Sequence, residues 1–511
     1  MSSLLDALQQ SAATAPQAPI PFTPIPKVAL DMPAFSWQDT AIDHVLTNGY
    51  GLIAYDMGTG KSIVGVGVAA SVAAARALPV LIVCPPTLIP TWQHEFRRFH
   101  SATRVTALSG NTPYAIGDTD VLIIGDSVVA KWAPVLAGNI SGIVVDESHN
   151  MKNRGAKRSK AVADIAAGIP ADGVKCLLTG TPLPNGKHIE LVGQLNILGH
   201  KAWDALGGYG NFWGTYWPKS AGNGWGGGGN ANHDLLHERS RAFTLRCRRE
   251  DVVEDLPHKG RNMVMLPVSG NRLNAYMKAQ QNLYDYIRDL PISDEDKMRR
   301  ISGAMRGRAI VLMNVLRRLS GEAKVPLVAD RVKELLNLQN NPKVELPDGT
   351  LASPGVLIFA EHRSVMDELE LKLLAYNPVT INGQTPNAHR QDMINAFVSG
   401  QSRVMIAHPK SAGVGLTLHG QGRNSHVIIA EQPWSPSSLV QAENRLHRMG
   451  QTVPVTVEVM VSEMTGVTSI DERMSSALHN KHLSASMFLD GEAEELLDVT
   501  GAVFESYKEE V

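Results

Sequence analysis

Short hydrophobic runs alternate with helical patterns along the first half of the chain. Residues 51–54 form one such run, and the helical pattern that follows begins at Ile63. Hydrophobic runs of this length, bounded by turn residues, are typical of strands buried on both faces of a sheet. Further runs occur at 80–84, at 121–124, at 143–145 and from 176 onward. The alternation predicts a mostly parallel sheet with helices on both faces and a ligand site at the carboxyl ends of its strands.

The same alternation restarts in the second half of the chain. Residues 271–340 show helical spacing, and strand-like runs then follow at 356–360, 404–407 and 427–430. We therefore predict an α/β fold of two similar lobes, with a helical insertion at the start of the second lobe. The predicted divisions are a flexible Pro- and Ala-rich leader at 1–34, lobe one at 35–257, lobe two at 258–490 with a helical protrusion at about 270–340, and an acidic tail at 491–511.

The composition is that of a folded protein with more than one core. The chain has 511 residues, of which 43% are hydrophobic, and its net charge of -2 gives no global basic field. Three widely spaced cysteines argue against a disulfide framework and a structural zinc site. No apolar run reaches the roughly 20 residues of a membrane span. We expect no membrane partner, and a cytoplasmic protein (nucleoid-associated or in an infected host cell), or a nuclear one if the organism is eukaryotic.

A glycine-rich loop lies between the first predicted strand and its helix. It contains Gly58 and Gly60 and ends in Lys61-Ser62. Such a loop directs backbone N–H groups and the positive end of a helix at one point, which favours a phosphate. Lys61 would contact the outer phosphates, and the Ser62 hydroxyl would bind Mg²⁺. The candidate nucleotide-binding residues here are Met57, Gly58, Thr59, Gly60, Lys61 and Ser62; the alternative is a chance glycine-rich turn.

Two adjacent carboxylates, Asp146 and Glu147, end the predicted strand at 143–145. Beside a nucleotide, Asp146 would hold Mg²⁺, and Glu147 would orient and deprotonate the attacking water. The alternative is an ordinary acidic turn. Thr179 and Thr181 follow the next strand, where they could bond to the carboxylate turn or simply end the strand.

Near the end of the second lobe, Arg445 and Arg448 lie three residues apart. On a helix both side chains would project from one face, and two guanidinium groups on one face suit a polyphosphate. Catalysis would then require the two lobes to close on each other. The alternative is a basic helix on the surface.

Each of the other candidate binding residues has two possible interpretations. Trp37 and Gln38 could read an adenine, or could be a core Trp and a surface Gln. The arginines between 239 and 249 favour equally a phosphate or lobe-to-lobe contact and a solvated face. The basic residues between 297 and 318 suit a duplex backbone, although a solvated helix face is the commoner meaning of such a cluster.

Five ordered segments resemble the motifs of the Swi/Snf-type ATPases of helicase superfamily two. They lie at 56–62, 146–153, 178–185, 411–416 and 441–451, and the last is the most specific for the family. The segments 146–149, 322–325 and 415–417 are most similar to the annealing-helicase, or HARP-like, branch. Three departures are Tyr55 in place of an acidic residue, Ser62 in place of Thr, and 125–127 in place of an aromatic segment that contacts DNA.

The resemblance implies two RecA-like P-loop lobes and a DNA-dependent ATPase that uses ATP and Mg²⁺. Such an enzyme moves along double-stranded or branched DNA and, in this branch, rewinds strands. Its partners would be replication, recombination or transcription proteins. The resemblance assigns the ATPase site to Lys61, Ser62, Asp146, Glu147, Gln441, Arg445 and Arg448, with Gln38 as an adenine contact. It assigns the coupling of nucleotide state to DNA contact to Thr179, Thr181, Gly413 and Gly415.

Two other functions remain open at this point. A helicase of the same superfamily that separates DNA or RNA strands would share these motifs. A nucleotide-gated platform that binds DNA or a protein with little turnover would also keep a phosphate loop. The pathway, polarity and oligomeric state do not follow from these motifs.

Overall fold

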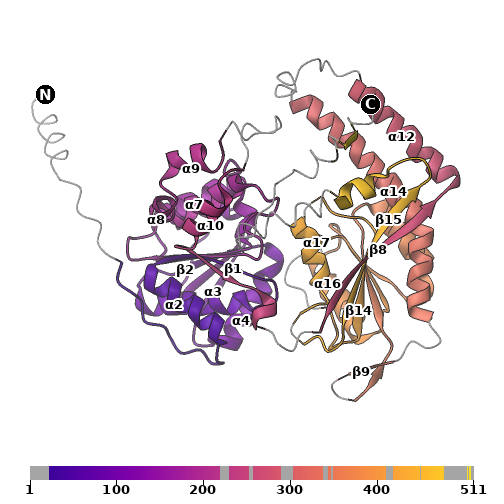
Figure 1. Ribbon diagram of the computed structural model, residues 1–511. Helices are drawn as coiled ribbons and strands as arrows, with labels where there is room; N and C mark the ends of the chain where they lie inside the picture. Colours follow the sequence, from indigo (N-terminus) through magenta and orange to yellow (C-terminus); the bar gives the residue numbers. More distant parts are fainter. Residues whose placement is uncertain are drawn as a thin grey trace, which may run out of the picture.

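Two parallel sheets, each flanked by helices, form two lobes that lie side by side (Figure 1). The structure is a computed structural model, and it describes residues 22–218, 230–252, 257–288, 303–337, 343–346, 349–409, 418–434, 436–448 and 450–476, with Val503, Ser506 and Tyr507. The strand order is β3-β4-β2-β5-β6-β1-β7 in the first sheet and β12-β13-β11-β14-β15-β8 in the second. The predicted fold class, two RecA-like lobes with parallel sheets, is confirmed.

Lobe one contains a seven-stranded sheet. Its strands are β1 (Tyr50–Tyr55), β2 (Val80–Cys84), β3 (Val105–Leu108), β4 (Val121–Gly125), β5 (Gly142–Asp146), β6 (Val174–Leu178) and β7 (Thr244–Cys247). Its helices are α2 (Ser36–Asn48), α3 (Lys61–Ala75), α4 (Ile89–Phe99), α5 (Val129–Leu136), α6 (Lys157–Ala167), α7 (Leu191–Leu198), α8 (His200–Ala205), α9 (Tyr209–Thr215), α10 (His233–Ser240) and α11 (Arg249–Val252).

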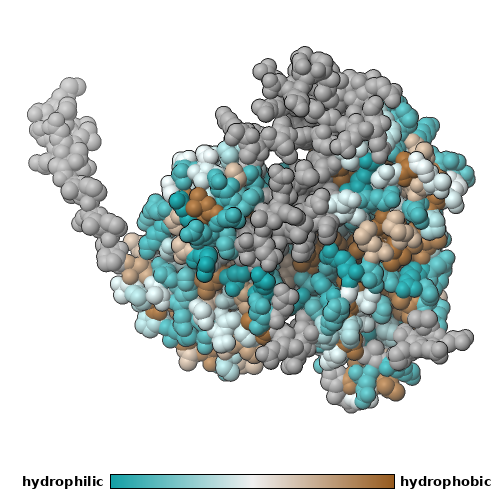
Figure 2. Space-filling view, viewed as in Figure 1, coloured by the Kyte–Doolittle hydropathy of each residue, from teal (hydrophilic) through white to brown (hydrophobic). Residues whose placement is uncertain are grey.

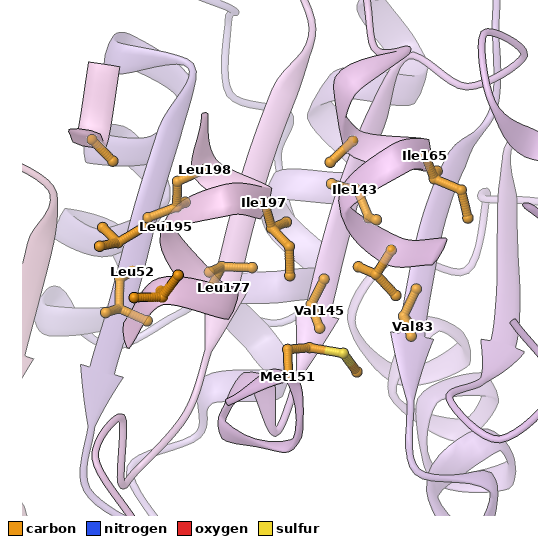
Figure 3. Close-up of a cluster of buried hydrophobic side chains, with 14 of the residues drawn as sticks. Leu52, Val83, Ile143, Val145, Met151, Ile165, Leu177, Leu195, Ile197 and Leu198 are labelled. Atoms are coloured by element: carbon orange, nitrogen blue, oxygen red, sulfur yellow. The ribbon is translucent and has the colours of Figure 1, made fainter. Parts of the chain in front are cut away.

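The central strands of this sheet are buried on both faces because their side chains alternate in direction. Leu52 of β1 packs into a core beneath α5, α6 and α7, whereas Ile53 packs into a second core beneath α2, α3 and α4. Figure 3 shows the first core, with Leu52, Leu177 and Val145 from adjacent strands and Ile165 and Leu195 on helices. The continuous hydrophobic runs in the sequence arise from this two-sided burial.

Lobe two contains a six-stranded sheet and a long helical segment. Its strands are β8 (Lys259–Val268), β11 (Gly355–Phe359), β12 (Val379–Ile381), β13 (Val404–Ala407), β14 (Asn424–Ile429) and β15 (Val455–Met464), and a small hairpin pairs β9 (Val344–Glu345) with β10 (Leu351–Ala352). Its helices are α12 (Gly270–Arg288), α14 (Gly303–Asn337), α15 (Arg363–Lys372), α16 (Asn387–Ser399) and α17 (Pro436–Glu443).

The two long helices α12 and α14 pack against each other on the outer side of lobe two (Figure 1). The second half of α14 also covers the sheet, since Val325, Val328 and Val332 are buried in a core with Ile358 of β11 and Met460 of β15. This helical segment is therefore part of the lobe's packed interior as well as an extension from it.

Several predicted regions lie outside the described residues. They include 1–21 of the predicted leader, 477–490 of lobe two, and the predicted tail apart from three residues. The strand β8 belongs to the second sheet and begins at Lys259, beside the predicted division at 257 and 258, and the division itself stays a prediction. No helix of the described part is long and apolar enough to cross a membrane. Polar residues cover much of the face seen in Figure 2, with smaller hydrophobic groups between them.

A close backbone contact in lobe one gives a stability prediction. A Cβ atom added at Gly193 of α7 would lie 1.9 Å from the carbonyl oxygen of Met151, just beyond the strand end that carries Asp146 and Glu147. We expect Gly193→Ala to lower the free energy of unfolding by about 1–3 kcal/mol, because α7 must move away. Gly214→Ala on α9 is the matched control, since nothing lies within 4 Å of its added Cβ. Urea denaturation of both variants tests this, and equal stabilities would contradict it.

Candidate nucleotide site between the lobes

The glycine-rich loop joins the end of β1 to the start of α3. Gly58 and Gly60 have φ angles of +86° and +80°, which L side chains rarely adopt, so glycine is needed at both positions. The Thr59 hydroxyl donates to the carbonyl oxygen of Asp56 at 2.8 Å and closes the loop. The loop thus ends where the first N–H groups of a 15-residue helix begin, an arrangement that attracts an anion.

The ammonium group of Lys61 is held inside this loop. Its Nζ donates to the carbonyl oxygens of Tyr55 at 2.9 Å and Asp56 at 3.0 Å. Burial lowers the pKa of Lys61, and the nearby carboxylates of Glu147, Asp146 and Asp56 oppose that shift.

The two carboxylates stand at the end of β5, next to the loop. Trp92 Nε1 donates to Asp146 Oδ2 at 3.0 Å, and the Glu147 backbone N–H donates to Asp146 Oδ1 at 2.9 Å. Burial raises the pKa of Asp146 to about 7, and the adjacent Glu147 charge adds to the rise. Glu147 has a φ of +48°, a strained conformation for a residue with a side chain, of the kind that clusters at functional sites.

A short chain of contacts connects Glu147 to the end of β6. Glu147 Oε2 lies 3.3 Å from His149 Nδ1, which is also 3.0 Å from Thr179 Oγ1. Thr179 Oγ1 accepts a hydrogen bond from the Thr181 backbone N–H at 3.1 Å. Burial lowers the pKa of His149, which favours the neutral imidazole in this chain. The expected contact between Thr179 and the carboxylate turn is present in the structure.

Arg445 and Arg448 reach the same cavity from lobe two. The cavity has a volume of about 610 Å³. Of the predicted site residues, those lining it are Met57, Gly58, Gly60, Lys61, Ser62, Asp146, Glu147, Arg445 and Arg448. The two half-sites, almost four hundred residues apart in sequence, therefore face one space.

The predicted helical placement of the arginines is wrong. Helix α17 ends at Glu443, and the two arginines follow it in a turn. The chain leaves the helix because the Arg445 N–H bonds to the Ala442 carbonyl, three residues back, while the Arg445 carbonyl accepts from the Leu418 N–H. Both side chains converge on the cavity through this turn.

Arg445 is buried and Arg448 is half-buried. Burial, together with the neighbouring Arg448 cation, lowers the pKa of Arg445 to about 9. Burial also lowers the pKa of Arg448, while the Glu147 carboxylate opposes that shift. Two desolvated cations in one cavity favour an anionic ligand.

Three predicted residues of the described chain do not line this cavity. Thr59 is buried and belongs to the loop itself. Gln38 is fully buried; its Oε1 accepts from the Phe35 N–H at 3.0 Å and its Nε2 donates to the Thr59 carbonyl at 2.9 Å. Gln441 is half-buried on α17. The adenine contact of Gln38 and the role of Gln441 stay predictions, and Gly413 and Gly415 lie outside the described residues.

Sequence reasoning missed the apolar half of the cavity and several polar lining residues. The missed lining residues include Met32, Pro33, Phe35, Leu88, Phe99 and Asn444. The helical spacing of Leu88 and Phe99 indicated a buried face, but it carried no signal that this face borders a ligand. Met32 and Pro33 belong to the predicted leader, which reaches the cavity because the Asp31 N–H bonds to the Phe99 carbonyl at 2.8 Å.

The basic clusters separate into different environments. Arg246 and Arg249 contact the phosphate loop, and Arg249 also contacts lobe two, so part of the 239–249 cluster makes a lobe-to-lobe contact. Arg317 is buried and paired with Glu361 at 2.7 Å, which removes it from a solvated face. Lys297, Arg299 and Arg300 lie outside the described residues.

Comparison with known families agrees with this arrangement. Residues 41–319 match the SNF2-related domain, and residues 343–450 match the helicase conserved C-terminal domain. The chain belongs to the SNF2-related family. The family resemblance inferred from the motifs is confirmed.

Curated relatives are about a quarter identical to the chain over the aligned residues. A SWI/SNF-related matrix-associated actin-dependent regulator of chromatin subfamily A-like protein 1 homolog of Caenorhabditis elegans is 26% identical, over 81% of this chain and 56% of its own length. The DNA annealing helicase and endonuclease ZRANB3 of Bos taurus is 26% identical, over 87% of this chain and 39% of its own length. The chain thus spans about 39–56% of the length of these relatives. The solved Sulfolobus solfataricus SWI2/SNF2 ATPase core in complex with dsDNA aligns with 96% of this chain and 98% of that chain, with a TM-score of 0.41 and 20% identity.

The bond between Trp92 and Asp146 gives a second stability prediction. Trp92→Phe removes the indole donor of a carboxylate, whereas Trp132→Phe removes an equally buried indole that donates to the neutral Gly110 carbonyl at 3.1 Å. Hydrogen bonds to charged groups contribute about 1.5–3 kcal/mol and neutral ones about 0.5–1.5 kcal/mol. We expect Trp92→Phe to destabilise the protein by about 1 kcal/mol more than Trp132→Phe in chemical denaturation well above pH 7, where Asp146, with a pKa of about 7, is ionised. A smaller loss for Trp92→Phe would show that the carboxylate does not depend on this donor.

Proposed function

We propose that the protein is an ATP-dependent translocase on double-stranded DNA that remodels or anneals DNA. The observation that carries the proposal is the shared cavity: the phosphate loop and carboxylates of lobe one face the arginine pair of lobe two across it. Hydrolysis at such a site would be coupled to relative movement of the lobes, which is the elementary step of a motor.

The cavity fits a nucleoside triphosphate with a divalent cation. Its cationic part contains Lys61, Arg445 and Arg448, and its apolar part contains Phe35 and Leu88. The Ser62 hydroxyl and the Asp146 carboxylate are oxygen ligands of the kind that Mg²⁺ prefers. When bound there, Mg²⁺ would neutralise part of the phosphate charge.

Each polar residue then has a distinct task. Lys61 would hold the outer phosphates once it leaves the loop carbonyls. Glu147, whose buried Oε2 has no hydrogen-bond partner among the described residues, would orient the attacking water and accept its proton. Arg445 and Arg448 would stabilise the charge on the transferred phosphoryl group, an effect worth about 10³–10⁵ in rate in nucleotide hydrolases.

The DNA substrate is proposed from the family and from the names of its members. One relative is named a DNA annealing helicase and another a regulator of chromatin. We propose double-stranded or branched DNA as the partner, with replication, recombination or transcription proteins recruited on it. The protein would then be located where DNA is, in the cytoplasm of a prokaryote or an infected cell, or in a nucleus. The proposed ATPase core comprises 35–257 and 258–490, and Gln38, Gln441 and Gly415 are proposed as further contacts of the nucleotide site.

The choice of nucleic acid is directly measurable. We expect duplex DNA to raise the rate of ATP hydrolysis at least about tenfold over the rate without DNA, and more than single-stranded DNA or RNA does. Lys61→Ala should abolish turnover because no other group can replace its charge within the loop. Lys131→Ala, an exposed lysine on α5, is the matched control and should keep the wild-type rate. Equal stimulation by single strands or RNA would favour the strand-separating alternative.

Separate binding and turnover assays distinguish a motor from a platform. Glu147→Gln and Arg448→Ala should each reduce kcat by about 10²–10⁴ while the dissociation constant for ATP changes by less than about tenfold, because both residues act mainly in the transition state. Binding is measured with a fluorescent ATP analogue, and turnover by phosphate release. If Glu147→Gln keeps the wild-type DNA-stimulated rate, the protein is instead a nucleotide-gated platform.

A further inference from the structure

The first residue of the phosphate loop is bound by the chain that leaves lobe one. Asp56 Oδ1 accepts from Arg246 Nη1 at 2.5 Å, and Asp56 Oδ2 accepts from the Arg249 backbone N–H at 3.1 Å. The Asp56 N–H also donates to the Cys247 carbonyl at 3.0 Å. The Asp56 carbonyl is one of the two acceptors that hold Lys61. Asp56 therefore joins the phosphate-binding lysine to the segment 246–249.

The Arg249 guanidinium extends from this segment to lobe two. There it contacts the turn at residues 444–448, which carries Arg445 and Arg448 and is called the arginine turn below. Arg249 Nη1 donates to the His447 carbonyl at 2.8 Å, and Arg249 Nη2 lies 3.4 Å from Asn444 Oδ1. These two acceptors flank Arg445 and Leu446 in the sequence, and His447 immediately precedes Arg448. The planar fork of an arginine can hold two acceptors at once, which fixes the orientation of the turn and not only its distance.

Other residues hold the same turn from the chain that enters lobe two. Lys259 Nζ donates to Glu443 Oε2 at 3.1 Å, and Arg261 pairs with the other oxygen of this fully buried carboxylate. His447 Nε2 lies 2.7 Å from the Pro257 carbonyl. Residues of the chain between the lobes thus contact both ends of the arginine turn. Among the residues named here that contact this turn, Arg249 also contacts the phosphate loop.

We infer that Arg249 is a positioning residue that couples the phosphate loop to the arginine turn. It does not line the nucleotide cavity; its side chain lies beside the loop, with Cδ 3.9 Å from where a Cβ of Gly58 would be. The Arg249 backbone N–H binds the Asp56 carboxylate, and the Arg249 guanidinium binds Asn444 and His447. A displacement of the phosphate loop is therefore transmitted to Arg445 and Arg448 through one side chain. The kinetic part of this inference rests on the proposed ATPase function.

The test combines kinetics with a distance measurement that needs no ATPase activity. Spin labels are placed at Asp164→Cys on α6 and Leu371→Cys on α15, two exposed positions in different lobes; the three native cysteines are buried. We expect Arg249→Ala to broaden the distribution of distances between the labels in pulsed electron paramagnetic resonance. We also expect it to reduce DNA-stimulated kcat by about 10–100-fold, with less than a threefold change in the dissociation constant for a fluorescent ATP analogue.

Further variants separate positioning from folding. Arg249→Lys keeps the charge but not the fork, so it should recover less than half of the lost rate. Asn444→Ala should add little to Arg249→Ala, because the contact between the two side chains is already absent in Arg249→Ala. Arg97→Ala, which removes an exposed arginine of lobe one outside the 239–249 cluster, should change neither readout. If Arg249→Ala fails to fold, Arg249→Gln takes its place, since the amide preserves most of the side-chain packing.

Each outcome has a distinct meaning. An unchanged distance distribution in Arg249→Ala overturns the inference, and so does a loss of ATP affinity that equals the loss of kcat. If the wild-type protein hydrolyses no ATP with any DNA, the proposed function fails. In that case the distance distributions alone decide whether Arg249 fixes the position of one lobe relative to the other.

Discussion

Charges of both signs, buried or half-buried around one cavity between two lobes, are the constraint on which the rest of this structure depends. Lys61, Arg445 and Arg448 lose hydration there, as do Asp146 and Glu147, and the pKa of Asp146 rises to about 7 while that of Arg445 falls to about 9. A buried charge is unfavourable unless a partner compensates it. Here the cations and carboxylates come from elements far apart in the sequence, so the compensation requires both lobes.

The surrounding residues serve mainly to hold these charges in place. Trp92 and the Glu147 backbone bind the two oxygens of Asp146, and Gln38 supports the loop through the Thr59 carbonyl. Arg249 connects the loop to the arginine turn. Pre-organised groups of this kind are the structural condition for electrostatic stabilisation of a transition state. Gln38 and Arg249 do not line the cavity, yet they help to decide where the charged atoms lie.

Much of the fold was predictable because the central strands are buried on both faces. The runs at 80–84 and 121–124 read as strands from hydrophobicity alone, and they are β2 and β4. The strand β3 is only half-buried, and β15 contains the buried Glu458, whose two oxygens bind Arg331 of α14 at 2.7 and 3.0 Å. A polar residue that is paired in the folded protein interrupts the pattern in the sequence, so β15 gave no clear signal.

The candidate site was predictable where a motif follows a strand end, and less so elsewhere. Lys61 and Asp146 follow directly from β1 and β5, whose carboxyl ends share one edge of the sheet. The arginine turn was misread as a helix because spacing does not reveal that Leu418 captures the Arg445 carbonyl. Contacts between segments two hundred residues apart, such as Arg249 with His447, have no local signature at all.

The central claim is that residues of both lobes act on one phosphoryl group. The most direct measurement is a structure of the protein with ADP, aluminium fluoride and duplex DNA, in which the fluoride stands in for the transferred phosphoryl group. Our account predicts that the guanidinium groups of Arg445 and Arg448 lie within hydrogen-bonding distance of the nucleotide phosphate and fluoride, opposite Lys61 and Glu147. A complex in which both arginines point away, so that lobe one alone surrounds the fluoride, would contradict it.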